Sequence, residues 1–188
     1  MRAFGSPRGS PSWGVTGAPG PDRFSKSNVV AELSLPQDYE DLLREFVETG
    51  VEFLLVGGWA VAVHGHGRGT DDMDLLIAAN EANASRVVAA LQRFGAPLDA
   101  HGVTKGLFAT ERYGYRLGRK PLLIEVLTRI DGVTFEEARR DAVMVEVAGL
   151  MIPVIGRRAL LANKLASGRP KDLADVEALE SQGRIGED

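Results

Sequence analysis

Apolar residues recur along the chain with two different spacings, one typical of helices and one typical of strands. Between positions 39 and 47 they return every three or four residues, which predicts an amphipathic helix that begins near Pro36 and ends at Gly50. The same spacing follows Asn80, a residue type that favours helix N-caps, and it stops at Gly95. Further helices are predicted from Thr134 through Arg140, over about 157–166 and over about 170–182.

Short apolar runs between turn residues predict the strands. The run that starts at Val51 ends in Gly57 and Gly58, which suits a buried strand followed by a sharp turn. Helices and strands that follow one another in this way predict an α+β fold in which helices flank a mixed sheet. The remaining predicted strands are one from about Asp72 to Ile77, a strand–turn–strand unit over 107–128 and a hairpin over 143–155 around Ala148-Gly149.

Two aspartates, Asp72 and Asp74, begin the strand that follows the glycine turn. In a strand, residues i and i+2 point to the same side, with Cα atoms roughly 6.5–7 Å apart. Asp72 and Asp74 are therefore predicted to present two carboxylates on one face. Carboxylate oxygens on a rigid strand are the ligands that Mg²⁺ prefers, and paired metal ions can clamp the attacking and leaving oxygens of a phosphoryl transfer. This pattern predicts a site for Mg²⁺ (or Mn²⁺) and a phosphate substrate.

The glycine pair has two possible interpretations. If residues 59–64 form a helix, Gly57 and Gly58 lie at its N-terminus, where free N–H groups and the helix dipole favour a phosphate. A tight turn without a ligand is the alternative. The aspartates that follow within one short segment favour the phosphate interpretation.

The segment from Gly57 to Asp74 resembles the nucleotidyltransferase superfamily with the DNA-polymerase-β-like fold. It is most similar in pattern to small prokaryotic members, including minimal nucleotidyltransferases and toxin-type relatives. The resemblance covers roughly residues 35–182 and implies a polymerase-β-like fold and metal-dependent transfer of a nucleoside monophosphate from an NTP to an acceptor hydroxyl. The matching positions are Gly57, Gly58, Ala60, Val61, His64, Gly65, Arg68, Thr70, Asp72 and Asp74.

The same resemblance implies roles for further residues. The family carries a third carboxylate on a later strand, and Glu125 is the candidate here, where many relatives have Asp. The segment from Lys164 to Asp175 is similar to the family's Lys-x-x-x-x-Arg-x-x-Asp-x-x-Asp ending. For its basic residues, pairing with the acidic residues of the last helix is the competing interpretation. The expected catalytic and metal-binding residues are Asp72, Asp74 and Glu125, and the expected nucleotide-binding residues are Gly57, Gly58, Arg68, Thr70, Lys164 and Arg169.

Length and composition limit the remaining possibilities. A chain of 188 residues with 44% apolar and 26% charged residues is typical of a single globular domain, which we place at residues 31–188 after a flexible Gly/Pro/Ser-rich tail at 1–30. The absence of cysteine excludes disulfides, thiolate metal sites and a cysteine nucleophile. No run of 18 apolar residues is present, so no membrane span is expected, and the lack of an apolar signal segment favours a cytoplasmic location.

Charge is distributed unevenly along the chain. Residues 101–171 contain 13 Lys and Arg against 7 Asp and Glu, whereas the rest contains 9 against 19. A polyanionic ligand could bind the basic part, and ordinary solvated side chains are the alternative. The basic residues are not interleaved with aromatic ones, so the pattern gives no specific indication of nucleic acid.

The sequence therefore predicts a nucleotidyltransferase that uses an NTP. The acceptor is left open and could be tRNA or another RNA, a protein or a small molecule. Two other classes stay open: a non-catalytic nucleotide-binding module, and one half of a toxin–antitoxin pair with a cognate partner protein.

Overall fold

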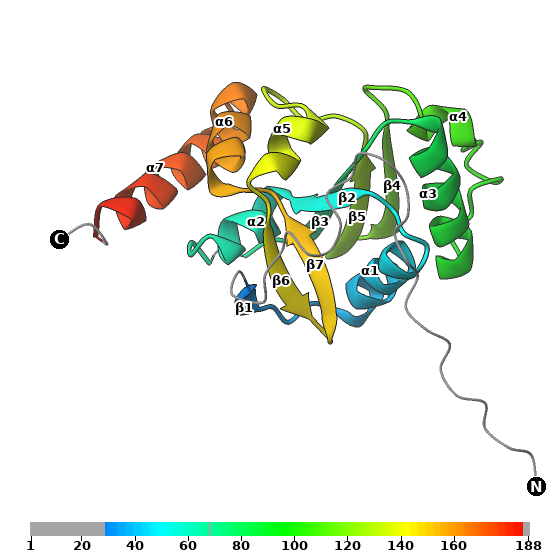
Figure 1. The fold of residues 1–188 in the computed structure, drawn as a ribbon, viewed down its shortest axis with the longest axis horizontal. Helices are drawn as coiled ribbons and strands as arrows, with labels where there is room; N and C mark the ends of the chain where they lie inside the picture. Colours follow the sequence, from blue (N-terminus) through cyan, green and yellow to red (C-terminus); the bar gives the residue numbers. More distant parts are fainter. Residues whose placement is uncertain (1–28, 68, 186–188) are drawn as a thin grey trace, which may run out of the picture.

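A seven-stranded mixed β-sheet runs through the computed structural model, with helices packed on both of its faces (Figure 1). The structure describes residues 29–67 and 69–185. The strands are β1 (Val29–Glu32), β2 (Phe53–Val56), β3 (Asp72–Ile77), β4 (Gly114–Arg119), β5 (Leu122–Leu127), β6 (Val143–Val147) and β7 (Leu150–Val154). The helices are α1 (Gln37–Glu48), α2 (Gly57–Val63), α3 (Glu81–Phe94), α4 (Lys105–Phe108), α5 (Phe135–Arg140), α6 (Arg157–Ser167) and α7 (Pro170–Ile185).

The strands lie in the order β1-β6-β7-β2-β3-β5-β4. The pairs β1–β6, β2–β7 and β3–β5 are parallel, whereas β2–β3, β4–β5 and β6–β7 are antiparallel. The predicted α+β fold with a mixed sheet is therefore confirmed. The parallel pairing of β3 with β5 requires a long connection, and α3, α4 and β4 supply it.

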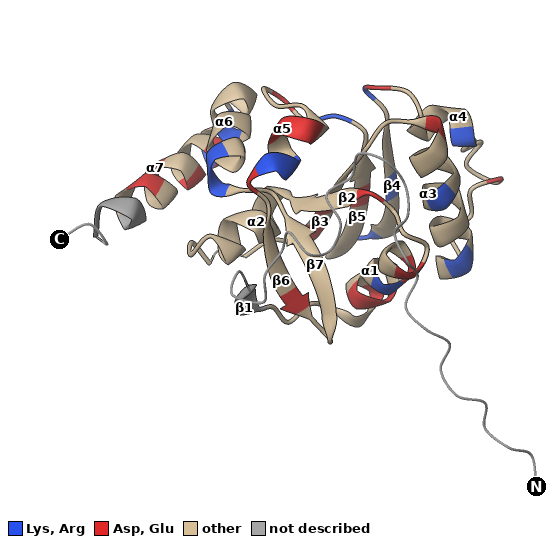
Figure 2. Ribbon diagram, viewed as in Figure 1, with Lys and Arg blue, Asp and Glu red and all other residues tan. Residues whose placement is uncertain are grey.

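Local signals place several elements where the sequence predicts them. The Asn80 side chain accepts a hydrogen bond from the backbone N–H of Asn83 at 2.9 Å, and Gly95 ends α3 in the left-handed conformation. Thr134 and Glu137 form a reciprocal capping box at the start of α5. In Figure 2 the first turn of α5 is acidic and its last turn basic, which complements the helix dipole.

The two faces of the sheet carry different helices. Met73 and Leu75 of β3 and Phe53 of β2 face one side, where the ring of Phe53 packs edge-on against Phe46 of α1 at a centroid distance of 5.4 Å. Helix α1 packs against α3, and α3 packs against α4. On the other face, α2 lies against β3 and contacts α6, which in turn packs against α5 and α7. Asp72 and Asp74 lie on this second face, since their side chains alternate with Met73 and Leu75.

Two described elements are absent from the predictions. Helix α4 and the turn after it occupy part of 107–113, where a strand was predicted, and β4 begins only at Gly114. A four-residue helix is too short to show a helical period, so the sequence offers no signal for it. Strand β1 pairs with β6, more than 100 residues later in the chain, and such a distant partner is not visible in a local pattern.

The predicted tail, residues 1–30, lies outside the described residues except for Val29 and Val30, which begin β1. Within the described ranges, no helix combines the length and the apolar character needed to cross a bilayer.

Candidate functional site

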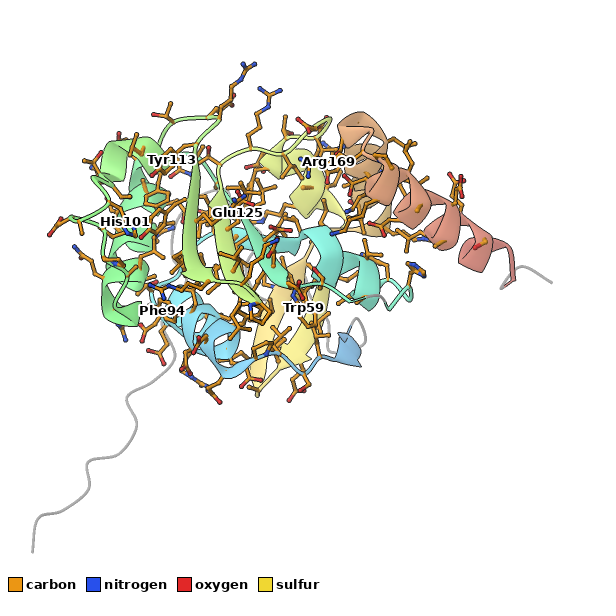
Figure 3. All side chains as sticks on the ribbon, turned by 180° about the vertical axis from the view of Figure 1, so that it is seen from behind. Trp59, Phe94, His101, Tyr113, Glu125 and Arg169 are labelled. Carbon is orange, nitrogen blue, oxygen red and sulfur yellow. The ribbon has the colours of Figure 1, made fainter. Side chains whose placement is uncertain are left out.

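Strands β3 and β5 bring three acidic residues to one face of the sheet. Asp74 lies directly opposite Glu125 in the parallel register, and Asp72 precedes Asp74 by two residues, so all three side chains leave the same face. Figure 3 shows Glu125 on β5 from behind the view of Figure 1. The apolar neighbours Met73, Ile124 and Val126 are buried on the opposite face. The alternation of polar and apolar residues on two paired strands thus gathers the carboxylates.

The electrostatic state of Asp74 is unusual for a carboxyl group. Burial raises its pKa to about 6, and the negative charges of Glu125 and Asp72 act in the same direction. Lys164 and Lys171 partly oppose this rise. A carboxyl held among other carboxylates is stabilised in its charged form by a cation, so this position favours a positively charged ligand.

Asp72 supplies a second observation that fits a cation. Its Oδ1 atom is buried and has no hydrogen-bond partner among the described residues. A buried carboxylate oxygen without a partner costs free energy. Together with Asp74, it offers the hard oxygen ligands that suit Mg²⁺ or Mn²⁺. The donor chemistry of this aspartate pair therefore fits the metal that the sequence predicts.

Glu125 has a protein partner instead. The guanidinium of Arg116 on β4 lies 3.1 Å from Glu125 Oε1, and 63% of the Arg116 side chain is exposed. In the described part of the chain, no three His, Cys, Asp or Glu side chains form a group that could hold a metal ion. Glu125 therefore faces Asp74 without completing a metal-binding group in this arrangement. Its participation requires Arg116 to swing away, which an exposed side chain on an edge strand is free to do.

The paired glycines lie against the start of β3. Gly57 has a positive φ of 65°, and a Cβ atom there would fall 1.9 Å from Oδ2 of Asp74. A Cβ on Gly58 would fall 2.4 Å from Oγ1 of Thr70, whose hydroxyl donates to the Asp72 carbonyl at 3.4 Å. The positive φ favours glycine at position 57, and a side chain at either position would force the turn or the facing Asp74 or Thr70 side chain to move. The structure brings the predicted turn and the predicted carboxylates into direct proximity.

The predicted basic residues are distributed differently. Lys164 is buried, and its Nζ lies 2.5 Å from Asp172 Oδ1 and 3.0 Å from Asp175 Oδ2, which is the pairing that the sequence left open as the competing interpretation. The Arg169 side chain is 77% exposed, and its Nε lies 3.9 Å from Asp172 Oδ2, which is a long distance for an ion pair. Arg68 lies outside the described residues. Lys164 nevertheless acts electrostatically on Asp74, so the corner between α6 and α7 lies near the carboxylates.

Tyr39 is a residue whose contribution the sequence analysis did not identify. Its hydroxyl lies 2.5 Å from the carbonyl oxygen of Asp71 and 3.0 Å from that of Leu123, so it joins the start of β3 to the start of β5. Burial, followed by the negative charge of Asp72, raises the pKa of Tyr39 to about 12, so the hydroxyl keeps its proton and donates. In the sequence, Tyr39 is only one apolar position of a helix stripe, and nothing there signals a link between two strands.

Tyr39→Phe is expected to lower the free energy of unfolding by about 1–2 kcal/mol, since it removes the donor from two carbonyls at part-buried positions. It should also weaken metal binding at Asp72, because the hydrogen bonds that join the start of β3 to the start of β5 are lost. Urea unfolding and metal titration test this. The matched control is Tyr115→Phe, whose hydroxyl bonds to the exposed His101. Equal metal affinity in wild type and Tyr39→Phe would contradict the positioning role.

Comparisons with known proteins give similarities at the level of the fold. No protein-family model matches the sequence, and no curated protein matches it. ANT(2″)-Ia in complex with adenylyl-2″-tobramycin is similar with 13% identity and a TM-score of 0.47, over 77% of this chain and 86% of that one. A candidate nucleotidyltransferase from Thermotoga maritima has 13% identity and a TM-score of 0.48, over 80% and 97%. The solution structure of the antibiotic-resistance factor ANT(2″)-Ia has 15% identity and a TM-score of 0.43, over 79% and 90%.

This similarity is limited, with TM-scores of 0.43–0.48 and identities of 13–15%. It concerns the arrangement of strands and helices, and it assigns no role to an individual residue of this chain.

Proposed function

We propose that this protein is a metal-dependent nucleotidyltransferase that moves a nucleoside monophosphate from an NTP to an acceptor hydroxyl. The observation that carries the proposal is the register of β3 and β5, which sets Asp74 opposite Glu125 with Asp72 on the same face. Oxygen ligands gathered on a rigid sheet beside a glycine turn are suited to metal-assisted phosphate chemistry.

Asp72 and Asp74 would hold Mg²⁺ or Mn²⁺, and Glu125 would join them once Arg116 releases it. When bound, the metal supplies positive charge that stabilises the oxygens of the reacting phosphoryl group. The burial that raises the pKa of Asp74 also strengthens any electrostatic interaction made there, because less water screens it. The negative charges of these carboxylates repel one another, so the site favours a bound cation.

The remaining residues would bind and orient the nucleotide. Gly57 and Gly58 would let the backbone approach the triphosphate closely. Thr70 lies against Gly58. Arg169 is exposed near the α6–α7 corner and would contact the phosphates as a guanidinium fork. Lys164, held by Asp172 and Asp175, would favour the charged form of Asp74 rather than contact the phosphates directly.

In the proposed reaction, the acceptor oxygen forms a bond to the α-phosphorus of the NTP. The bond from that phosphorus to the bridging oxygen breaks, pyrophosphate leaves, and the hydroxyl proton is released to solvent. The residues contribute mostly by positioning and by charge stabilisation, as is general for phosphoryl transfer.

A non-catalytic nucleotide-binding module is the second candidate. The ion pair between Arg116 and Glu125 favours it, since a glutamate that stays paired with an arginine leaves the metal site with two carboxylates. Transfer to a cognate protein or RNA in a toxin–antitoxin pair is a finer form of the main proposal, with the same chemistry and a particular acceptor.

Nucleotide affinity is expected to depend on the metal. We expect ATP to bind at least tenfold more tightly with Mg²⁺ or Mn²⁺ than in chelator, because Asp72 and Asp74 would bridge to the phosphates through the metal. Isothermal calorimetry measures this directly. Asp72→Asn should remove most of the metal dependence, whereas the control Asp99→Asn, at an exposed loop position, should keep it. Equal ATP affinity with and without metal would remove the basis of the proposal.

A further inference from the structure

A hollow of about 430 Å³ opens where β5 ends and β4 begins, close to the carboxylate face but outside the residues assigned above. Figure 3 shows Tyr113, which lines it, near the start of β4. A volume of this size is in the range of small-molecule sites. The hollow is lined by Arg112, Tyr113, Gly114, Leu127, Arg129, Ile130 and Asp131.

This hollow continues the face that carries Glu125. Leu127 follows Glu125 by two residues on β5, so both side chains leave the same face, and Gly114 lies opposite Leu127 on β4. A Cβ atom on Gly114 would come within 3.3 Å of Leu127 Cδ2 and 3.9 Å of Glu125 Oε1. Because position 114 is glycine, no side chain there separates the hollow from the Glu125 carboxylate. A ligand in the hollow would therefore lie next to the proposed reaction centre.

Two arginines give the hollow its charge. Arg112 and Arg129 are exposed, and neither guanidinium forms an ion pair within the described part of the chain. Some other described arginines are paired, as Arg93 is with Glu45 at 2.7 Å. Asp131 contributes one negative charge to the lining, so the side chains of the hollow carry a net positive charge.

Two hydrogen bonds between Tyr113 and Thr128 join the segments that carry the two arginines. The N–H of Tyr113 donates to Thr128 Oγ1 at 2.8 Å, and the N–H of Thr128 donates to the Tyr113 carbonyl at 2.9 Å. Arg112 precedes Tyr113 and Arg129 follows Thr128, so both leave the sheet at this bridge. The Tyr113 ring is fixed by an edge-on contact with Phe108 at 5.4 Å. The hollow thus combines a hydrogen-bonded frame with two exposed cationic side chains in its lining.

We propose that this hollow binds a phosphate group of the acceptor, and that Arg112 and Arg129 bind the phosphate oxygens. The proposal rests on the proposed function, because it assigns the hollow to the molecule that receives the nucleotidyl group. Guanidinium groups match the oxygens of a phosphate in paired hydrogen bonds, and two of them facing one small hollow favour an anion over a neutral or cationic acceptor. The phosphate has two possible sources, a free sugar phosphate or the end of an RNA strand.

Binding of two probes to the full chain in chelator, without NTP, tests the proposal. The probes are ribose 5-phosphate, followed by calorimetry, and a 5′-phosphorylated single-stranded hexaribonucleotide with a fluorescent 3′ end, followed by anisotropy. We expect Arg112→Gln and Arg129→Gln each to weaken the probe that binds by at least tenfold, since each removes a charge-assisted contact. The matched control is Arg119→Gln, which removes an exposed arginine at the other end of β4.

Each outcome supports or overturns phosphate binding in the hollow. Loss of ribose 5-phosphate binding in the two variants supports a small phosphorylated acceptor, and loss of hexaribonucleotide binding alone supports an RNA end. Equal weakening by Arg119→Gln would indicate a diffuse charge effect and overturn the proposal, as would the absence of binding by both probes. Chemical labelling of wild-type arginines with phenylglyoxal avoids any folding defect of the variants. The bound probe should protect Arg112 and Arg129, and unchanged labelling of both would also overturn the proposal.

The test separates this hollow from the catalytic proposal. Asp74→Asn should not weaken the binding of either probe, because Asp74 does not line the hollow and its negative charge does not attract a phosphate. Probe binding that depends on Arg112 and Arg129 in a protein without transferase activity would support the hollow as a phosphate site and contradict its assignment to an acceptor. Arg112→Gln and Arg129→Gln could also leave transferase activity unchanged with every acceptor. That result would contradict acceptor binding in the hollow and support the proposed nucleotidyltransferase function.

Discussion

Asp74→Asn is expected to lower nucleotidyl transfer by roughly 10²–10³-fold, the scale seen when one preorganised electrostatic group is removed from an active site. The substitution keeps the shape of the side chain and removes one of the charges that would hold the metal. Gly57 packs against the Asp74 side chain and tolerates the isosteric amide, so the glycine turn should keep its position. Nucleotide binding without metal should therefore change little.

The same substitution should stabilise the metal-free protein above pH 6. The pKa of Asp74 is about 6 in the folded state against 3.8 for the ordinary group, so the folded chain binds this proton more tightly than the unfolded chain. The contribution of Asp74 to the free energy of unfolding is therefore most favourable below pH 3.8, and it falls as the pH rises toward 6. Two pKa units correspond to about 3 kcal/mol, which is the upper bound of the gain expected in Asp74→Asn at neutral pH.

Urea unfolding of wild type and Asp74→Asn in chelator, at pH 4 and at pH 7.5, measures this difference. The variant should gain stability over wild type between the two pH values, and the gain should disappear when saturating metal is added. A stability difference that is the same at both pH values would contradict the assigned electrostatics. Transfer that persists undiminished in the variant would contradict the catalytic role.

Lys164→Met is expected to destabilise the protein by about 3–5 kcal/mol, the cost of breaking a buried ion pair from one side. The ammonium of Lys164 lies between two buried carboxylates on α7, and Ser167 donates to one of them at 2.6 Å. Without the lysine, Asp172 and Asp175 stay buried and lose this cation. These ion pairs join α6 to α7, so the loss of stability should appear as a lower midpoint of unfolding.

The matched control is Lys171→Met, an exposed lysine that also acts on Asp74 and should change stability by less than about 0.5 kcal/mol. Both variants remove a positive charge that lowers the pKa of Asp74, so both should shift metal binding to higher pH. The double variant Lys164→Met/Asp172→Asn should recover part of the lost stability, because one buried charge is removed with its partner. A loss below 1 kcal/mol in Lys164→Met would show that the pair contributes little.

The sequence predicts most of the elements because their signals are local. Asn80, Thr134 and the Ala148-Gly149 pair each act within a few residues, through caps or a turn with positive φ. The shared face of Asp72 and Asp74 also follows from a local rule, the two-residue period of a strand. Strand β1 and helix α4 escape prediction because one depends on a distant partner and the other is too short to show a period.

The contacts between elements could not be read in the same way. Glu125 enters the sequence analysis through a family resemblance, since its position opposite Asp74 depends on β3 pairing with β5 in one register. The pairing of Glu125 with Arg116 depends in addition on the register of β4. The bridge formed by Tyr39 needs the carbonyls of two strands to lie together over one helix. These facts are properties of the assembled sheet.

The parallel pairing of β3 with β5 has a consequence for the growing chain on the ribosome. Strand β3 is complete at Ile77, but its outer edge gains a neighbour only after Leu127 has emerged. During that interval the edge exposes backbone groups that could pair with another nascent chain, a hazard that charged side chains reduce. Asp72 and Asp74 lie on this edge strand and repel a second copy of themselves. Two carboxylates in the proposed reaction centre would thus also protect the nascent chain from pairing with another nascent chain.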